Sequence, residues 1–304
     1  MKIGLSGGGT IERMLDQSAE AEADGFSSMW YAGAIGYDPL MVIALVGQRT
    51  STIELGTSIV QTYPRHPVSL AQSTVTARAA VGSARLTLGV GVSHQPAIEG
   101  YGLSFDKPAR HLSEYLRVLT PVLKGERVDV QGDQYRVRMD PRPQAPTAPD
   151  VPVLVAALGP AMLKVTGRLA DGTITWMANR VAIDKHVAPL LRSAAEDAGR
   201  ASPRIVVGLP VAVCDEAQGR EEAAKQFAGY GMLPNYQRIL QAGGAGGPGD
   251  AAIVGSEERV AGELEALIEA GATDVWAAVF PVGDDRAESR RRTRALLKEL
   301  ATPA

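Results

Sequence analysis

Short apolar runs alternate with amphipathic stretches along the whole chain. The runs are rich in Val, Ile, Leu, Thr and Gly and are bounded by turn residues, which indicates buried strands. Strands are predicted at 3–6, 26–30, 53–60, 86–92, 153–157, 173–177, 205–213 and 274–280. Apolar residues recur at helical spacing between them, and helices are predicted at 11–24, 39–49, 67–81, 108–123, 161–170, 182–198, 216–227 and 257–270, with a last helix that ends at Leu300.

Strand and helix units follow one another until eight strands have been counted. Eight units close a parallel (β/α)8 barrel, whereas an open doubly wound sheet usually stops at about five or six strands. We therefore predict an α/β protein with a TIM-barrel fold, formed by one domain over residues 1–304. Two strands, 55–60 and 88–94, end in small residues, and strand ends of this kind leave room for a flat ligand at the mouth of a barrel.

Two insertions interrupt the repeat. After the fourth strand, residues 127–138 read as a hairpin around Gln131-Gly132-Asp133 and lead into a proline-rich stretch. After the seventh strand, residues 230–242 precede the glycine-rich segment 243–249, which is predicted to stay outside a packed core and to be mobile. A lid over the barrel mouth and a plain loose loop are both open interpretations of this second insertion.

Charge and cysteine usage exclude several classes. The net charge is −3, and the basic tract Arg290-Arg291-Arg292 is best explained as a solvated helix face, which argues against nucleic-acid binding. Cys214 is the one cysteine, which excludes an internal disulfide, and its apolar strand predicts a buried, inert thiol. No apolar run is long enough for a signal peptide or a membrane span, so we expect a cytoplasmic protein without membrane contact.

Sequence motifs for phosphate loops, metal sites and nucleophiles are absent. Gly7-Gly8-Gly9 and Gly89-x-Gly91 lack the glycine spacing of a dinucleotide fingerprint. The four histidines form no HxH or HExxH group, so no metal site is expected. Neither Ser58 nor Ser93 lies in a GxSxG elbow, which disfavours a hydrolase.

Several segments resemble the bacterial luciferase-like superfamily over nearly the whole chain. They are Gly56-Thr57-Ser58-Ile59-Val60, Tyr63-Pro64-Arg65-His66-Pro67 and the stretches 86–91, 155–160 and 167–172. Within that superfamily the Gly-Thr-Ser-aliphatic run is similar to the branch that uses the deazaflavin coenzyme F420. The resemblance implies an F420-dependent oxidoreductase that moves a hydride between the deazaflavin C5 and a small organic substrate with a C=C, C=N or C=O/alcohol group.

The resemblance also implies where the coenzyme binds. A non-proline cis peptide is expected at Ser58-Ile59, against the central ring. The next strand end is expected to lie beside the ring and the following loop to take the phosphate side through backbone amides; the residues are Gly91, Val92 and Ser93, then Ala156, Ala157, Leu158, Gly159 and Pro160.

The resemblance places His94 where related sugar-phosphate dehydrogenases have a catalytic carboxylate. We expect His94 to exchange the proton of the reaction, and packing in the loop is the alternative. Tyr31 and Trp176 are the candidate substrate-pocket residues, each with a core role as the alternative, and Trp30 is expected in the core. His66 is expected to be structural, and the absence of an acidic residue and a histidine after Trp30-Tyr31 argues against a sugar-phosphate dehydrogenase.

Two other functions stay open at this point. An FMN-dependent monooxygenase of the same superfamily would consume oxygen with the help of a reductase. A non-catalytic barrel would bind a flavin-like ligand without turnover. The expected partners are a small-molecule substrate and a second copy of the chain in a homodimer.

Overall fold

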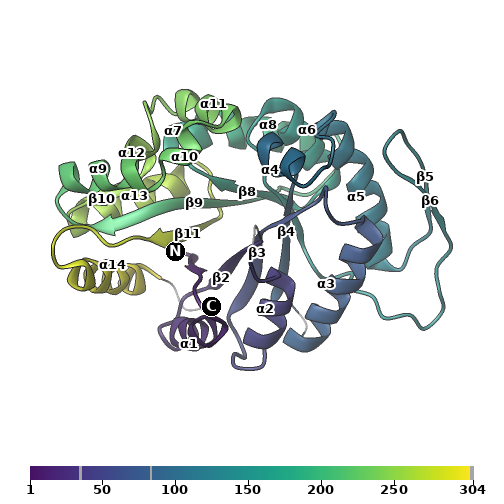
Figure 1. Cartoon of the computed structure of the whole chain (residues 1–304), viewed down its shortest axis with the longest axis horizontal. Coiled ribbons are helices and arrows are strands. Elements are labelled where there is room, and N and C mark those ends of the chain that lie inside the picture. The colour runs from purple at the N-terminus through teal and green to yellow at the C-terminus, as the bar shows by residue number, and fades with distance from the viewer. Residues whose placement is uncertain (34–35, 83, 302–304) are drawn as a thin grey trace.

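A closed barrel of parallel strands forms the centre of the computed structural model, which describes residues 1–33, 36–82 and 84–301 (Figure 1). Neighbouring strands pair in parallel around the ring, and β8–β9 and β11–β1 pairing closes it. The barrel strands are β1 (Ile3–Gly7), β2 (Ser28–Gly33), β3 (Glu54–Gln61), β4 (Leu86–Gly91), β7 (Val153–Val155), β8 (Gly172–Trp176), β9 (Arg204–Val213) and β11 (Asp274–Val279). All eight predicted strands and the predicted barrel are confirmed.

Helices cover the outside of the barrel, where the predicted amphipathic stretches lie. Thr10 caps the first helix by accepting from the Arg13 amide, and Asp38 caps the second by accepting from the Leu40 and Met41 amides. The main covering helices are α1 (Ile11–Ala23), α2 (Pro39–Val46), α3 (Pro67–Val81), α5 (Pro108–Lys124), α6 (Pro160–Leu169), α8 (Ala188–Glu196), α13 (Glu257–Glu269) and α14 (Arg286–Leu300).

Further elements lie in the connections between the barrel strands. The predicted hairpin is confirmed as β5 (Val128–Gln131) and β6 (Arg136–Met139). The predicted helix 182–198 is divided by a π-helical turn. The remaining elements are α4 (Gln95–Gly100), α7 (Arg180–Ala182), η1 (Ile183–Val187), α9 (Glu216–Gln226), α10 (Ala228–Gly231), α11 (Pro234–Ala242), α12 (Pro248–Ala251) and β10 (Ile253–Gly255), which pairs with β9.

The prediction that segment 243–249 stays outside a packed core was wrong. Gly243, Pro248 and Gly249 are buried, and Pro248 begins α12. A Cβ atom at Gly249 would lie 2.5 Å from the Arg220 carbonyl oxygen, and one at Gly243 would lie 2.3 Å from Asn179. The glycines therefore allow close backbone packing here, where a sequence pattern of this kind usually indicates a free loop.

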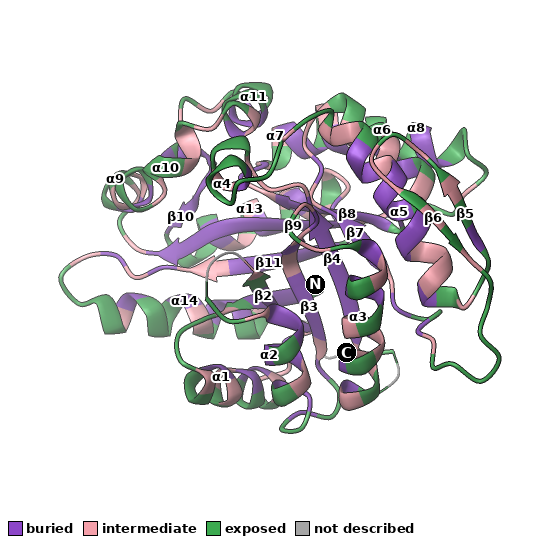
Figure 2. Cartoon of the chain, turned by 45° about the vertical axis from the view of Figure 1, so that its right-hand side comes forward, coloured by how far each residue is buried: buried purple, intermediate pink, exposed green. Residues whose placement is uncertain are grey.

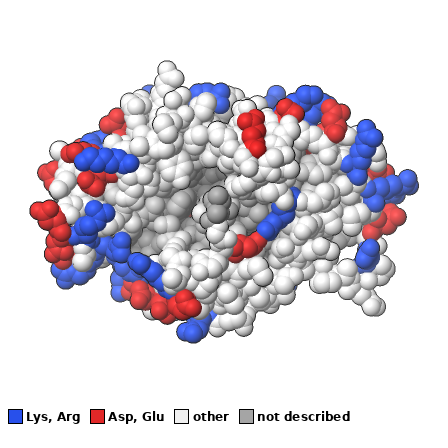
Figure 3. Space-filling view, viewed as in Figure 1, with Lys and Arg blue, Asp and Glu red and all other residues white. Residues whose placement is uncertain are grey.

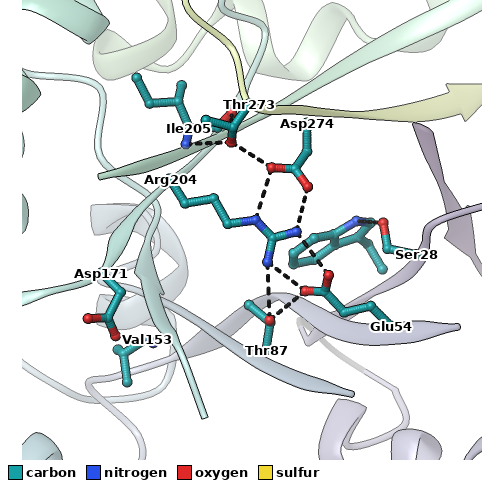
Figure 4. Close-up of polar contacts among 10 residues, drawn as sticks. Ser28, Glu54, Thr87, Val153, Asp171, Arg204, Ile205, Thr273 and Asp274 are labelled. Atoms are coloured by element: carbon teal, nitrogen blue, oxygen red, sulfur yellow. Dashed lines mark hydrogen bonds and ion pairs between the residues drawn. The ribbon is translucent and has the colours of Figure 1, made fainter. Parts of the chain in front are cut away.

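A charged network fills the amino-terminal end of the barrel (Figure 4). Arg204 donates to Glu54 at 2.7 and 3.0 Å and to Asp274 at 2.7 and 2.9 Å. Thr87 also donates to Glu54. Burial alone would lower the pKa of Arg204, but its bonds to Asp274 and Glu54 outweigh burial and raise it.

Above this network, three tryptophans fill the middle of the barrel, and we call them the tryptophan layer. Trp30 and Trp276 are buried and Trp176 is half-buried, and the rings of Trp176 and Trp276 stack with centroids 5.1 Å apart. Gly208 makes room for Trp276, because a Cβ atom there would lie 2.0 Å from the indole. Figure 2 shows that the barrel strands are largely buried, and the predicted core position of Trp30 is confirmed.

Candidate active site

Small inward-facing residues surround the space beyond the tryptophan layer, at the carboxyl ends of the strands. A Cβ atom at Gly91 would lie 3.1 Å from Ala156 Cβ and 3.1 Å from the Ile59 side chain. Three of the predicted cofactor-binding residues, Ile59, Gly91 and Ala156, therefore meet across three neighbouring strands. The surface view shows a hollow near the middle of the molecule (Figure 3).

The predicted non-proline cis peptide between Ser58 and Ile59 is confirmed. The strand register between β3 and β4 shifts between Gly56 and Val60. The Thr57 hydroxyl replaces regular pairing there, donating to the Gly89 carbonyl at 2.7 Å and accepting from the Gly89 amide at 2.8 Å. Ile59 packs against the residues of the tryptophan layer, so its side chain points into the barrel near the carboxyl ends of the strands.

Two strand ends carry non-glycine residues in the left-handed region. Ser93 follows β4 with φ 63° and Met177 follows β8 with φ 63°. Such residues cost about 1–3 kcal/mol each and cluster at functional sites. Ser93 Oγ accepts a hydrogen bond from Gln61 Nε2 at 2.9 Å, which ties the end of β4 to the end of β3.

His94 comes next along the chain and precedes α4. Its imidazole hydrogen-bonds the Asn235 side chain on α11, and its ring centroid lies 5.4 Å from that of Tyr236. Its Nδ1 is buried and has no hydrogen-bond partner in the described part of the chain. Burial lowers the pKa of His94 below its usual 6.5, and the Asn235 bond opposes that shift. The imidazole is therefore neutral at pH 7 and can accept a proton.

Aromatic rings connect the tryptophan layer with the cover of the mouth. The Tyr230 ring centroid lies 5.8 Å from that of Trp176 and 5.0 Å from that of Tyr236. Tyr236 is buried in α11, so the segment predicted as a lid or a loose loop is helical and packed. Nε1 of Trp176 and Nε1 of Trp276 are buried without a partner in the described ranges. Unpartnered buried donors of this kind are uncommon in folded proteins and indicate a missing partner.

The loop predicted to bind a phosphate leads into α6. The Leu158 carbonyl accepts a hydrogen bond from His186 Nε2 at 2.8 Å, and open space surrounds Gly159, the residue before α6. The side chains of Val92, Ala157 and Leu158 pack in the core between strands and helices. Any ligand in the barrel mouth would therefore meet the backbone of these residues.

The prediction that Tyr31 lines a substrate pocket was wrong. Its side chain is 2% exposed, lies in the core between strands and helices, and hydrogen-bonds Ser18 on α1. Alternate residues of a strand face opposite sides, and Trp30 takes the inward position, so Tyr31 points away from the barrel interior. Burial raises the pKa of Tyr31 to about 12.

Two other residues near the predicted mouth also face elsewhere. Met177 is fully buried in the outer core, and Arg180 forms an ion pair with Glu263 at 3.5 Å. His66 is structural, as predicted, because its Nδ1 accepts from the Val68 amide at the start of α3.

Cys214 is half-buried rather than fully buried, and burial raises the pKa of its thiol, which keeps the thiol protonated.

Sequence reasoning missed Trp276 and Asn235. A signal for Trp276 existed, because it pairs with Gly208 on the adjacent strand and a glycine leaves room for a large side chain opposite it. For Asn235 no local signal existed, because its partner His94 lies on a distant loop. In the described ranges no His, Cys, Asp and Glu residues form a group of three or more that could hold a metal, and no helix is long and apolar enough to cross a membrane.

Comparisons with known proteins identify the family of the chain and several relatives. The model of the luciferase-like monooxygenase family matches residues 2–300. An uncharacterised protein of Mycobacterium tuberculosis is 30% identical over 260 residues, which is 78% of this chain and 75% of that protein. A 5,10-methylenetetrahydromethanopterin reductase of Methanolobus tindarius is 24% identical over 283 residues, covering 91% and 84% of the two chains.

Among solved structures, the fold is similar to the coenzyme F420-dependent tetrahydromethanopterin reductase of Methanopyrus kandleri. That comparison gives a TM-score of 0.79 at 22% identity and covers 98% of this chain and 96% of the other.

Proposed function

The chain belongs to the luciferase-like monooxygenase family, and we propose that it is an F420-dependent oxidoreductase within it. The substrate is a small organic molecule with a C=C, C=N or C=O/alcohol group. The observation that carries the proposal is the buried His94 Nδ1 without a partner, beside a cradle of small residues at the mouth of the barrel. The F420-dependent reductase with a similar fold supports it.

The residues of the mouth fit a flat, anionic coenzyme. Gly91 leaves open the space that a side chain would take between Ile59 and Ala156, so a planar ring can approach the backbone there. The indole N–H groups of Trp176 and Trp276 are donors in need of an acceptor. The amino terminus of α6, after Gly159, suits a phosphate because no described side chain caps it and the helix dipole favours negative charge.

Bound F420 would supply the hydride chemistry, and the side chains of this chain supply the proton path and the dry site. Neutral His94 accepts a proton from an alcohol in the oxidising direction, and its protonated form returns a proton in the reducing direction. Asn235 orients the imidazole from α11. Tyr230 and Tyr236 cover the mouth and exclude water from it.

The first experiment is a parallel titration of the purified protein with oxidised F420 and with FMN, followed by protein fluorescence. We expect F420 to bind with a micromolar or lower Kd and FMN at least tenfold more weakly. A Gly91→Val variant should weaken F420 binding at least tenfold, because the added atoms fill the cradle. Gly262→Val is the matched control, since open space surrounds that position on α13.

Turnover then distinguishes the remaining functions. F420-linked reduction or oxidation in a panel of enones, imines and alcohols would support the proposal. Preferred FMN binding with oxygen consumption would overturn it in favour of a monooxygenase. F420 binding without turnover of any panel compound would favour a non-catalytic barrel.

A further inference from the structure

A cavity of about 270 Å³ lies outside the barrel wall, beside α1 and α14. Leu5, Met29 and Ala277 form its inner side, and these residues of β1, β2 and β11 belong to the core that faces the helices. The cavity is therefore separate from the space inside the barrel. It is smaller than the roughly 300–1,000 Å³ of pockets that hold drug-sized ligands, so it suits a small ion or a single group.

Positive side chains line this cavity. Arg13 and Gln17 come from α1, and Arg290 and Arg294 come from α14. No aspartate or glutamate is among its described lining residues. A cavity with this set of side chains attracts an anion.

The basic side chains between α1 and α14 fall into two groups, one with acidic partners and one without. Farther along both helices, Asp24 accepts from Arg294 at 2.8 Å and from Lys298 at 2.8 Å. Nearer the start of each helix, the guanidinium groups of the exposed residues Arg13 and Arg290 have no ion pair or hydrogen bond to any residue that the structure describes. The basic side chains with acidic partners thus lie beyond the part of the cavity that Arg13 and Arg290 line.

Backbone geometry adds to the positive potential. The loop Gly7-Gly8-Gly9 leads from β1 into α1, and Gly9 has φ 107°. A Cβ atom at Gly9 would lie 2.9 Å from Arg13 Cδ, so the Arg13 side chain lies against this loop. α1 begins beside the cavity, and the amino end of a helix carries a partial positive charge.

We propose that this cavity is a phosphate-binding site in which Arg13 and Arg290 are the main ligands. Two guanidinium groups can each donate two parallel hydrogen bonds to the oxygens of one phosphate group. Gln17 and Arg294 complete the wall around the group. The phosphate group is either free inorganic phosphate or part of a larger ligand that extends from the surface.

The test uses the protein without any coenzyme. Inorganic phosphate is titrated at constant ionic strength into wild type, the double variant Arg13→Gln/Arg290→Gln, and the control Arg117→Gln/Arg138→Gln. The control removes two exposed arginines that have no ion pair in the described structure and lie away from the cavity. We expect saturable binding to wild type and control by calorimetry, and a Kd at least tenfold higher for the Arg13/Arg290 variant.

Parallel F420 titrations identify the source of the phosphate group. Weaker phosphate binding with unchanged F420 affinity would show a site for a free anion. Weaker binding of both would show that the cavity, and not the amino terminus of α6, holds the phosphate of the coenzyme. Equal phosphate binding by the two double variants, or no saturable binding to wild type, would overturn the proposal. Far-UV circular dichroism confirms that each variant is folded, so lost binding is not lost structure.

Discussion

Replacing Arg204 by Met should destabilise the barrel strongly and leave its mouth intact. The change removes four hydrogen bonds to Glu54 and Asp274 and leaves both carboxylates without their cation. Breaking a buried ion pair on one side costs about 3–5 kcal/mol. The Asp274 side chain is 4% exposed and that of Glu54 24%, so solvent relieves one carboxylate more than the other and we expect about 3 kcal/mol.

Urea unfolding followed by circular dichroism at pH 7 measures this loss. In thermal unfolding, at about 2 °C per kcal/mol for a chain of this size, the same loss is expected to lower the Tm by about 6 °C. Arg117→Met, at an exposed position on α5, is the control and should stay within about 0.5 kcal/mol.

A loss below about 1 kcal/mol would refute this reasoning, because it would mean that the network does not hold the lower barrel together. F420 affinity within threefold of wild type is expected as well, because stability and chemistry occupy opposite ends of barrel strands.

Three further predictions test other parts of the structure. The rate of alcohol oxidation should fall as the pH drops through a midpoint below 6.5, because protonated His94 cannot accept a proton. The Asn235→Ala variant should move this midpoint lower still. A His94→Gln variant whose rate still falls with pH in this way would remove His94 from the reaction. Burial would raise the pKa of Glu22, but bonds from the Thr52, Ile53 and Ser51 amides lower it to about 2, so the stability it contributes is complete above pH 4.5 and is lost as the pH falls towards 2. Glu22→Gln should cost about 2 kcal/mol at pH 7 in thermal unfolding, and an unchanged Tm would show that these bonds contribute nothing. Tyr31→Phe should cost about 1 kcal/mol and leave F420 affinity within twofold, whereas a tenfold loss of affinity would return Tyr31 to the pocket.

The strands could be predicted because each is a short apolar run between turn residues. In a parallel barrel both faces of a strand are covered, so the runs are apolar throughout and their positions are clear. The same property hides which residue faces inward. Ser28 to Tyr31 are all buried, and no alternation separates Trp30 from Tyr31. Gly56 decides the matter, because the space beside it on the next strand accommodates the Trp30 ring.

Contacts between distant segments account for the rest. Asn235 reaches His94 because α11 folds back over the mouth, and no spacing in the sequence encodes that approach. The glycines near α12 are ambiguous for a similar reason. A glycine can free a loop or permit close packing, and here the nearness of Arg220 and Asn179 decides for packing.

The inward positions of the barrel strands change in size and charge from one end to the other. On β11, inward Asp274 belongs to the charged network and inward Trp276 to the tryptophan layer. On β4, inward Thr87 joins the network, whereas Gly91 leaves the mouth open. A flat ligand can therefore sit only at the carboxyl ends, where side chains are small and His94 is near. The charged network and the tryptophan layer stabilise the barrel. Residues at the mouth can therefore bind a ligand and transfer a proton, even though some of them have strained backbone angles.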